Sequence, residues 1–136
     1  MKILGIDPGM AIVGYSLVDY DGKVCKLLKS GSIQTKKGTR EASRLLEIME
    51  DMTTIVEAFK PDVASIEKLF FFRNQTTVMP VAHARGIILA ILEKYGVPQT
   101  ESVLACPFIW HSYTSAFYVR DILGITDTAI FDGIYY

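Results

Sequence analysis

The sequence predicts a single α/β domain built around a mixed sheet, and three patterns support this prediction. Apolar runs at residues 2–7, 11–18 and 23–33 have the length and residue types of strands. The dipeptide Asp21-Gly22 between the second and third runs is a strong hairpin signal. A segment with helical apolar spacing, residues 42–59, and a fourth short apolar run, residues 63–67, come next. A helix is the usual connection to a strand that pairs in parallel, so the fourth strand is expected to pair in parallel with a strand of the antiparallel meander.

Two helices are predicted in the second half of this pattern. In residues 42–59 the apolar positions recur at helical spacing, Thr39 is the expected N-cap, and Pro61 stops the helix. The fourth strand, 63–67, comes directly after it. A second helix is expected over about residues 76–95.

The second helix has an unusual composition. Residues 87–92 are apolar on every face, so each side of this segment needs a cover. Either other parts of this chain bury all sides of the segment, or a second copy of the chain buries one of them. On the second interpretation Ile88 and Ile91 are candidate outward positions.

The composition is that of an ordinary globular protein of 136 residues, half of them hydrophobic. No apolar run reaches the ~18 residues of a membrane helix, and the first residues do not resemble a signal peptide, so we expect no membrane association and a cytoplasmic location. The net charge of −1 does not by itself indicate a nucleic-acid-binding protein. Residues 1–101 hold 13 of the 14 basic residues, so residues 102–136 are poor in positive charge.

Two acidic residues, Asp7 and Glu67, each stand at the end of a predicted strand. If these strands are parallel neighbours, ~4.8 Å apart, both carboxylates meet at the edge where open α/β sheets carry ligands. Two carboxylates at that distance repel unless a cation or proton lies between them, and Mg²⁺ takes such oxygen ligands. The pattern therefore indicates metal-assisted phosphodiester hydrolysis. Simpler roles remain open: Asp7 as a turn residue before Pro8-Gly9, and Glu67 as a solvated strand end.

Several short motifs occur in order along the first hundred residues: Gly5-Ile6-Asp7-Pro8-Gly9, Gly14-Tyr15, Ser65-Ile66-Glu67-Lys68-Leu69-Phe70, Arg73-Asn74, Ala84-Arg85-Gly86 and Val97-Pro98. Over about residues 1–98 the chain resembles the RuvC family of Holliday-junction resolvases. The resemblance implies an RNase H-like fold, with a mixed five-stranded sheet flanked by helices, and a homodimer. It also implies an endodeoxyribonuclease that uses Mg²⁺ to nick four-way DNA junctions symmetrically in recombination and repair, together with the RuvA–RuvB branch-migration complex.

The resemblance also implies roles for single residues. Asp7 and Glu67 match two catalytic carboxylates that bind metal, with two Mg²⁺ ions per site in the family. Phe70 matches an aromatic residue placed against unpaired bases, a contact worth ~1–3 kcal/mol. Arg73 and Arg85 are candidate phosphate contacts. Core packing of Phe70, and a structural ion pair for Arg85 within its apolar helix, remain alternatives.

From about residue 99 the sequence departs from the family pattern. Family members end in a helix with two Asp residues three apart, whereas Asp127 and Asp132 are five apart and would point ~140° apart on a helix. We therefore interpret residues 1–101 as the nuclease domain. Residues 102–136 are interpreted as an atypical tail in place of the family's last strand and helix, produced by a shifted reading frame or by divergence.

Two other functions are compatible with parts of the sequence. Without the third carboxylate, the chain is a catalytically impaired relative that binds junctions without cutting them. The second alternative is a fragment of an actin-like ATPase, since such proteins open with a similar Gly-Ile-Asp strand end. Their phosphate loop usually has Gly-Thr after the Asp, however, where Pro8-Gly9 stands in this chain.

Overall fold

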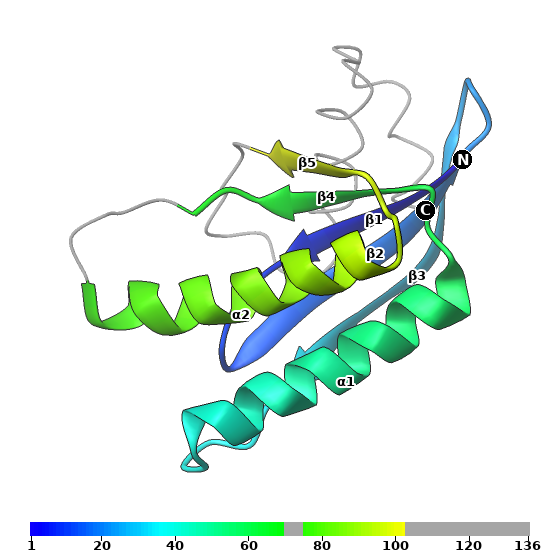
Figure 1. The fold of residues 1–136 in the computed structure, drawn as a ribbon. Helices are drawn as coiled ribbons and strands as arrows, with labels where there is room; N and C mark the ends of the chain where they lie inside the picture. Colours follow the sequence, from blue (N-terminus) through cyan, green and yellow to red (C-terminus); the bar gives the residue numbers. More distant parts are fainter. Residues whose placement is uncertain (70–74, 103–136) are drawn as a thin grey trace.

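The computed structural model describes residues 1–69 and 75–102. They form one mixed sheet whose helices both lie against the same face (Figure 1). The strands are β1 (Lys2–Asp7), β2 (Ile12–Tyr20), β3 (Cys25–Gln34), β4 (Val63–Glu67) and β5 (Gln99–Ser102), and the helices are α1 (Glu41–Phe59) and α2 (Gln75–Lys94). The strand order β3-β2-β1-β4-β5 confirms the predicted five-stranded mixed sheet.

The first three strands form the predicted antiparallel meander, and β4 and β5 extend it in parallel beyond β1. The Asp21 carboxylate closes the β2–β3 turn by accepting the backbone N–H groups of Lys23 and Val24, each at 2.9 Å. Gly22 adopts φ +101°, which a residue with a side chain rarely does. The Asp-Gly pair therefore sets this hairpin as its sequence indicates.

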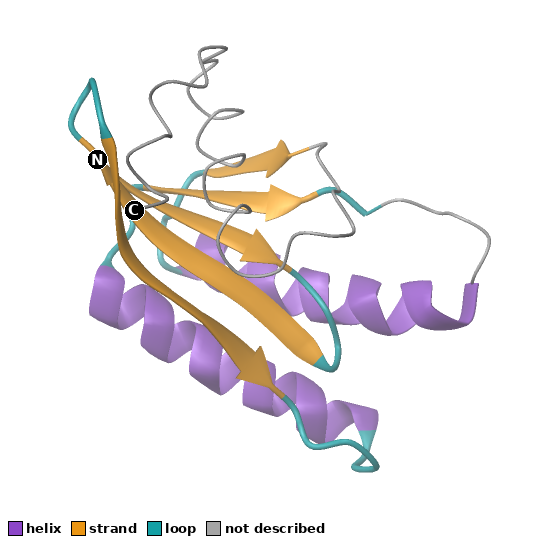
Figure 2. Cartoon of the chain, turned by 180° about the vertical axis from the view of Figure 1, so that it is seen from behind, coloured by secondary structure: helices purple, strands orange, loops and turns teal. Residues whose placement is uncertain are grey.

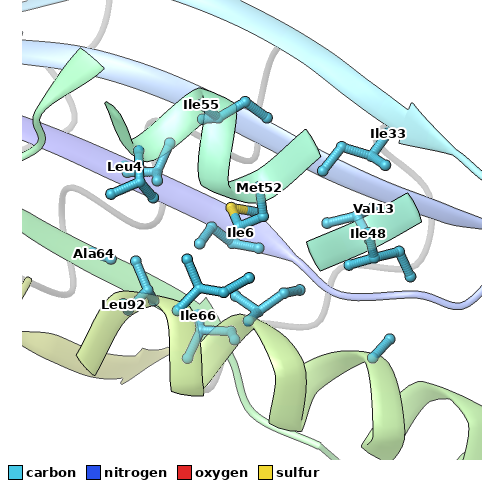
Figure 3. Close-up of a cluster of buried hydrophobic side chains, with 14 of the residues drawn as sticks. Leu4, Ile6, Val13, Ile33, Ile48, Met52, Ile55, Ala64, Ile66 and Leu92 are labelled. Carbon is cyan, nitrogen blue, oxygen red and sulfur yellow. The ribbon is translucent and has the colours of Figure 1, made fainter. Parts of the chain in front are cut away.

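The core lies between the sheet and its two helices (Figure 3). Strand alternation directs Leu4 and Ile6 of β1, and Ala64 and Ile66 of β4, toward the helices. The helical residues that cover them are all buried: Ile48, Met52, Ile55 and Val56 of α1, and Ala84, Ile88, Ile91 and Leu92 of α2. Seen from behind, the opposite face of the sheet carries neither helix (Figure 2). No helix in the described part of the chain is long and apolar enough to cross a membrane.

Two predictions about the helices are wrong. The N-cap of α1 is Arg40, with no side-chain cap, because the Thr39 hydroxyl donates instead to the Lys36 carbonyl at 2.7 Å within the preceding loop. Ile88 and Ile91 are not outward positions, since their side chains are 0% and 5% exposed. The side of α2 that holds them faces the sheet, so this one chain covers them.

Candidate active site

The parallel pairing of β1 with β4 brings the two predicted carboxylates together. Ile6 of β1 is in register with Ile66 of β4, so the next residue of each strand, Asp7 and Glu67, lies at the same carboxyl edge. The two carboxyl groups lie close enough for Asp7 to raise the pKa of Glu67. Because Ile6 and Ile66 face the helices, alternation directs both carboxyl groups to the opposite face of the sheet.

The environment of Glu67, including the nearby Asp7, changes the pKa of its carboxyl group. Burial raises the pKa of Glu67 first, and the hydrogen bond and negative charge of Asp7 raise it further, to about 8. Near neutral pH and without a cation, the raised pKa of Glu67 therefore favours the protonated form of its carboxyl group. The pair holds one proton where a cation would otherwise balance its charge.

The turn after Asp7 is fixed by close backbone packing. A Cβ at Gly9 would collide with the carbonyl oxygen of Ile12, so this turn requires glycine. The Thr35 hydroxyl at the end of β3 donates to the Met10 carbonyl at 2.6 Å and accepts from Nε of Arg44 at 2.8 Å. The loop that follows Asp7 is thereby tied to both β3 and α1.

Arg85 lies on the helix side of the same edge. Its Nη2 donates to the Glu101 carboxylate at 2.7 Å, and its Nε donates to the Glu67 carbonyl at 3.4 Å. The Arg85 side chain is only 15% exposed. Of the two roles left open by the sequence, the structure shows the ion pair, which ties α2 to the ends of β4 and β5.

Ser65 is a polar residue that the sequence argument did not single out. It lies two positions before Glu67 on the same face of β4, opposite Gly5 of β1. Its Oγ is buried and has no hydrogen-bond partner among the residues described. Buried polar atoms are normally paired, so this orphaned oxygen marks the neighbourhood of the carboxylates as a place for a polar ligand.

Other predicted site residues are not placed by the structure. Phe70 and Arg73 lie outside the described residues, as does the tail from residue 103 that contains Asp127 and Asp132. Within residues 1–69 and 75–102, no third His, Cys, Asp or Glu joins Asp7 and Glu67 in a metal-binding group.

Comparison with known proteins identifies the family. The sequence model described as "Crossover junction endodeoxyribonuclease RuvC" matches residues 3–102. The chain belongs to the RuvC family. A crossover junction endodeoxyribonuclease RuvC of Brevibacillus brevis is 48% identical over 101 residues, which are 74% of this chain and 61% of that protein. The corresponding protein of Petrotoga mobilis is 43% identical over 98 residues, 72% of this chain and 60% of the relative.

Solved structures agree with this assignment. The RuvC of T. thermophilus in complex with a Holliday junction substrate is 25% identical and matches with a TM-score of 0.73, covering 93% of this chain and 82% of that one. The yeast mitochondrial Holliday junction resolvase Ydc2 is only 14% identical, with a TM-score of 0.57 over 97% of this chain and 63% of that one, and shows the fold alone. These neighbours confirm the RNase H-like fold expected from the sequence motifs. The chain spans about three fifths of the length of the Brevibacillus and Petrotoga relatives.

The raised pKa of Glu67 predicts a specific pH dependence of stability in metal-free protein. Between pH 4.5, the group's ordinary pKa, and about 8, the folded state holds a proton that the unfolded chain has released. The free energy of unfolding therefore falls as pH rises through this window. Glu67→Gln should remove this part of the pH dependence, and the exposed Glu50→Gln should not. Urea unfolding in EDTA at pH 5 and pH 8 measures the difference; identical pH dependence in all three proteins would contradict the paired geometry.

Proposed function

We propose that this protein is a Mg²⁺-dependent endonuclease that nicks four-way DNA junctions symmetrically in recombination and repair. The observation that carries the proposal is the meeting of Asp7 and Glu67 at the carboxyl edge of parallel strands in a RuvC-family domain. The relatives are named as crossover junction endodeoxyribonucleases, and the T. thermophilus protein was solved with a Holliday junction. Both facts support the proposed substrate and reaction.

The residues at this edge fit a magnesium ion. Asp7 and Glu67 offer oxygen ligands only, which are the ligands Mg²⁺ prefers, and the buried Ser65 oxygen lies on the same face. When bound, the metal supplies positive charge that activates the attacking water and stabilises the leaving oxygen. Two ions per site, as in the family, would need ligands in addition to these two carboxylates.

The chain's own residues prepare the edge for this chemistry. With a cation bound, both carboxylates would be ionised, and Asp7 and Glu67 would hold it from two neighbouring strand ends. Gly14 is the β2 residue opposite Asp7 and has no side chain to cover it. A DNA backbone can therefore approach the Asp7 carboxylate from the β2 side.

Phe70 and Arg73 are proposed to bind DNA, Phe70 by stacking on an unpaired base and Arg73 by contacting a phosphate. Arg85 was a third candidate for a phosphate contact. Such a contact would have to replace its ion pair with Glu101. The proposal also includes the RuvA–RuvB complex as a partner and the cytoplasm as the compartment.

A homodimer is proposed because a four-way junction presents two equivalent strands, which a two-fold dimer can match with two equivalent sites. The outer surfaces of α1 and α2 carry exposed apolar side chains, among them Leu46, Met49 and Met79. Between the two helices lies a groove of about 570 Å³ with a largely apolar lining: Glu41, Ala42, Leu45, Ala82, His83, Gly86 and Ile87. This helical surface is the proposed interface.

The catalytic role predicts a separation of cutting from binding. Asp7→Asn or Glu67→Gln should reduce Mg²⁺-dependent nicking of a synthetic four-way junction on the order of 100-fold or more, since each removes the charge of a metal ligand. Junction affinity should persist, because phosphate contacts supply most of it. Asp51→Asn, an exposed acidic position on α1, is the matched control and should leave both unchanged. Equal loss of binding and cutting, or no nicking by the unaltered protein, would contradict the proposal.

The dimer interface predicts that a charge on the outer face of α1 separates the subunits. Leu46→Glu should raise the dimer dissociation constant on the order of 100-fold, because an unpaired carboxylate would be buried between the copies. Val24→Glu, at an equally exposed apolar position in the β2–β3 turn, serves as the control. Sedimentation velocity over a concentration series measures both. A dimer unaffected by Leu46→Glu would place the interface elsewhere.

A further inference from the structure

The loop between β3 and α1 carries a cluster of three positive side chains, Lys36, Lys37 and Arg40. All three are exposed. Within the described residues, none of them forms an ion pair with a carboxylate. The nearest acidic residue along the chain is Glu41, whose carboxylate instead contacts His83 of α2. Among residues 1–69 and 75–102, no ion pair therefore neutralises the positive charge of this loop, although the chain as a whole has a net charge of −1.

The topology places this loop at the same edge of the sheet as the carboxylate pair. Both β3 and β1 run antiparallel to β2, so their carboxyl ends lie at the same edge. The register is continuous across the three strands, from Asp7 to Gly14 to Ser32. Asp7 and Ser32, which lies two residues before the end of β3, are thus separated by two strand spacings, about 10 Å. The loop continues from that point into α1 (Figure 1).

The loop is built as an ordered turn. Thr39 donates its hydroxyl proton to the Lys36 carbonyl at 2.7 Å, and Gly38 supplies a backbone with φ +83°. Just before the turn, the Thr35 hydroxyl is bonded to the Met10 carbonyl in the turn that follows Asp7. The loop that carries the positive side chains is therefore ordered, and a hydrogen bond joins the residue before it to the turn that follows Asp7.

We propose that Lys36, Lys37 and Arg40 bind the phosphate backbone of a DNA duplex arm that leads to the Asp7–Glu67 site. This inference rests on the proposed nuclease function. Duplex DNA carries one negative charge per ~1.7 Å of its axis, so three exposed cations that follow β3 at the carboxylate edge of the sheet complement it. Lysine and arginine at an exposed turn contact phosphates and fix the position of the duplex without reading its sequence. The loop is thus a binding site for duplex backbone, separate from contacts at the junction centre.

The test compares two triple variants with equal loss of charge. The first is Lys36→Gln, Lys37→Gln and Arg40→Gln. The control is Lys23→Gln, Lys26→Gln and Lys29→Gln, three exposed cations on the same hairpin that lie farther from the catalytic edge. Affinities for a four-way junction and for a linear duplex are measured in EDTA across a salt series. Matching circular dichroism spectra establish that each variant is folded.

The loop variant should make the negative slope of log affinity against log salt shallower by about 2.7, because each of the three lost phosphate contacts on B-DNA accounts for ~0.9. Its dissociation constants for junction and duplex should both rise, on the order of tenfold, since the loop contacts an arm. The control variant should change the slope by less than about 1. Equal effects of the two triples, or no effect of the loop triple on a protein that binds DNA, would overturn the proposal. If the unaltered protein binds a four-way junction no more tightly than a linear duplex, the result counts against the proposed function. In that case, the affinities of the two triple variants for linear duplex still decide the role of the loop.

Discussion

The parallel pairing of β1 with β4 is the constraint on which the site depends. It places two carboxyl groups at one edge of the sheet, where they repel each other unless a proton or cation lies between them. Burial raises the pKa of Glu67, and the neighbouring Asp7 raises it further, to about 8. The residues just before the pair, Ile6 and Ile66, are fully buried under the helices, so the core keeps the two carboxyl groups together whether or not both are ionised.

The surroundings of the pair stabilise the same edge from three directions. Gly9 permits the tight turn after Asp7, Thr35 joins that turn to β3, and Arg85 ties α2 to the ends of β4 and β5. These contacts hold the edge that carries the two carboxylates in a fixed conformation. They also place the positive β3–α1 loop in fixed relation to the carboxylates, so a duplex bound by that loop would be aligned with the site.

The sequence was sufficient to predict the strands and the proximity of Asp7 and Glu67. The Asp21-Gly22 hairpin signal and the short apolar run at residues 63–67 leave few alternative strand pairings. It was insufficient where a residue has competing partners. Thr39 had a nearby carbonyl to bond instead of the helix terminus. Residues 87–92 are apolar all round and so do not reveal which face meets the sheet. The partner of Arg85 is Glu101, 16 residues away, and their contact depends on how β5 pairs with β4.

The paired strand ends of β1 and β4 are proposed to hold a divalent cation between Asp7 and Glu67. Crystals of the protein grown with Mn²⁺, with anomalous diffraction measured at the manganese edge, test it directly. The account predicts an anomalous peak between the two side chains, about 2.1–2.2 Å from a carboxylate oxygen of each, close to the distance for Mg²⁺. Absence of a peak at this edge in crystals that hold manganese elsewhere would contradict it.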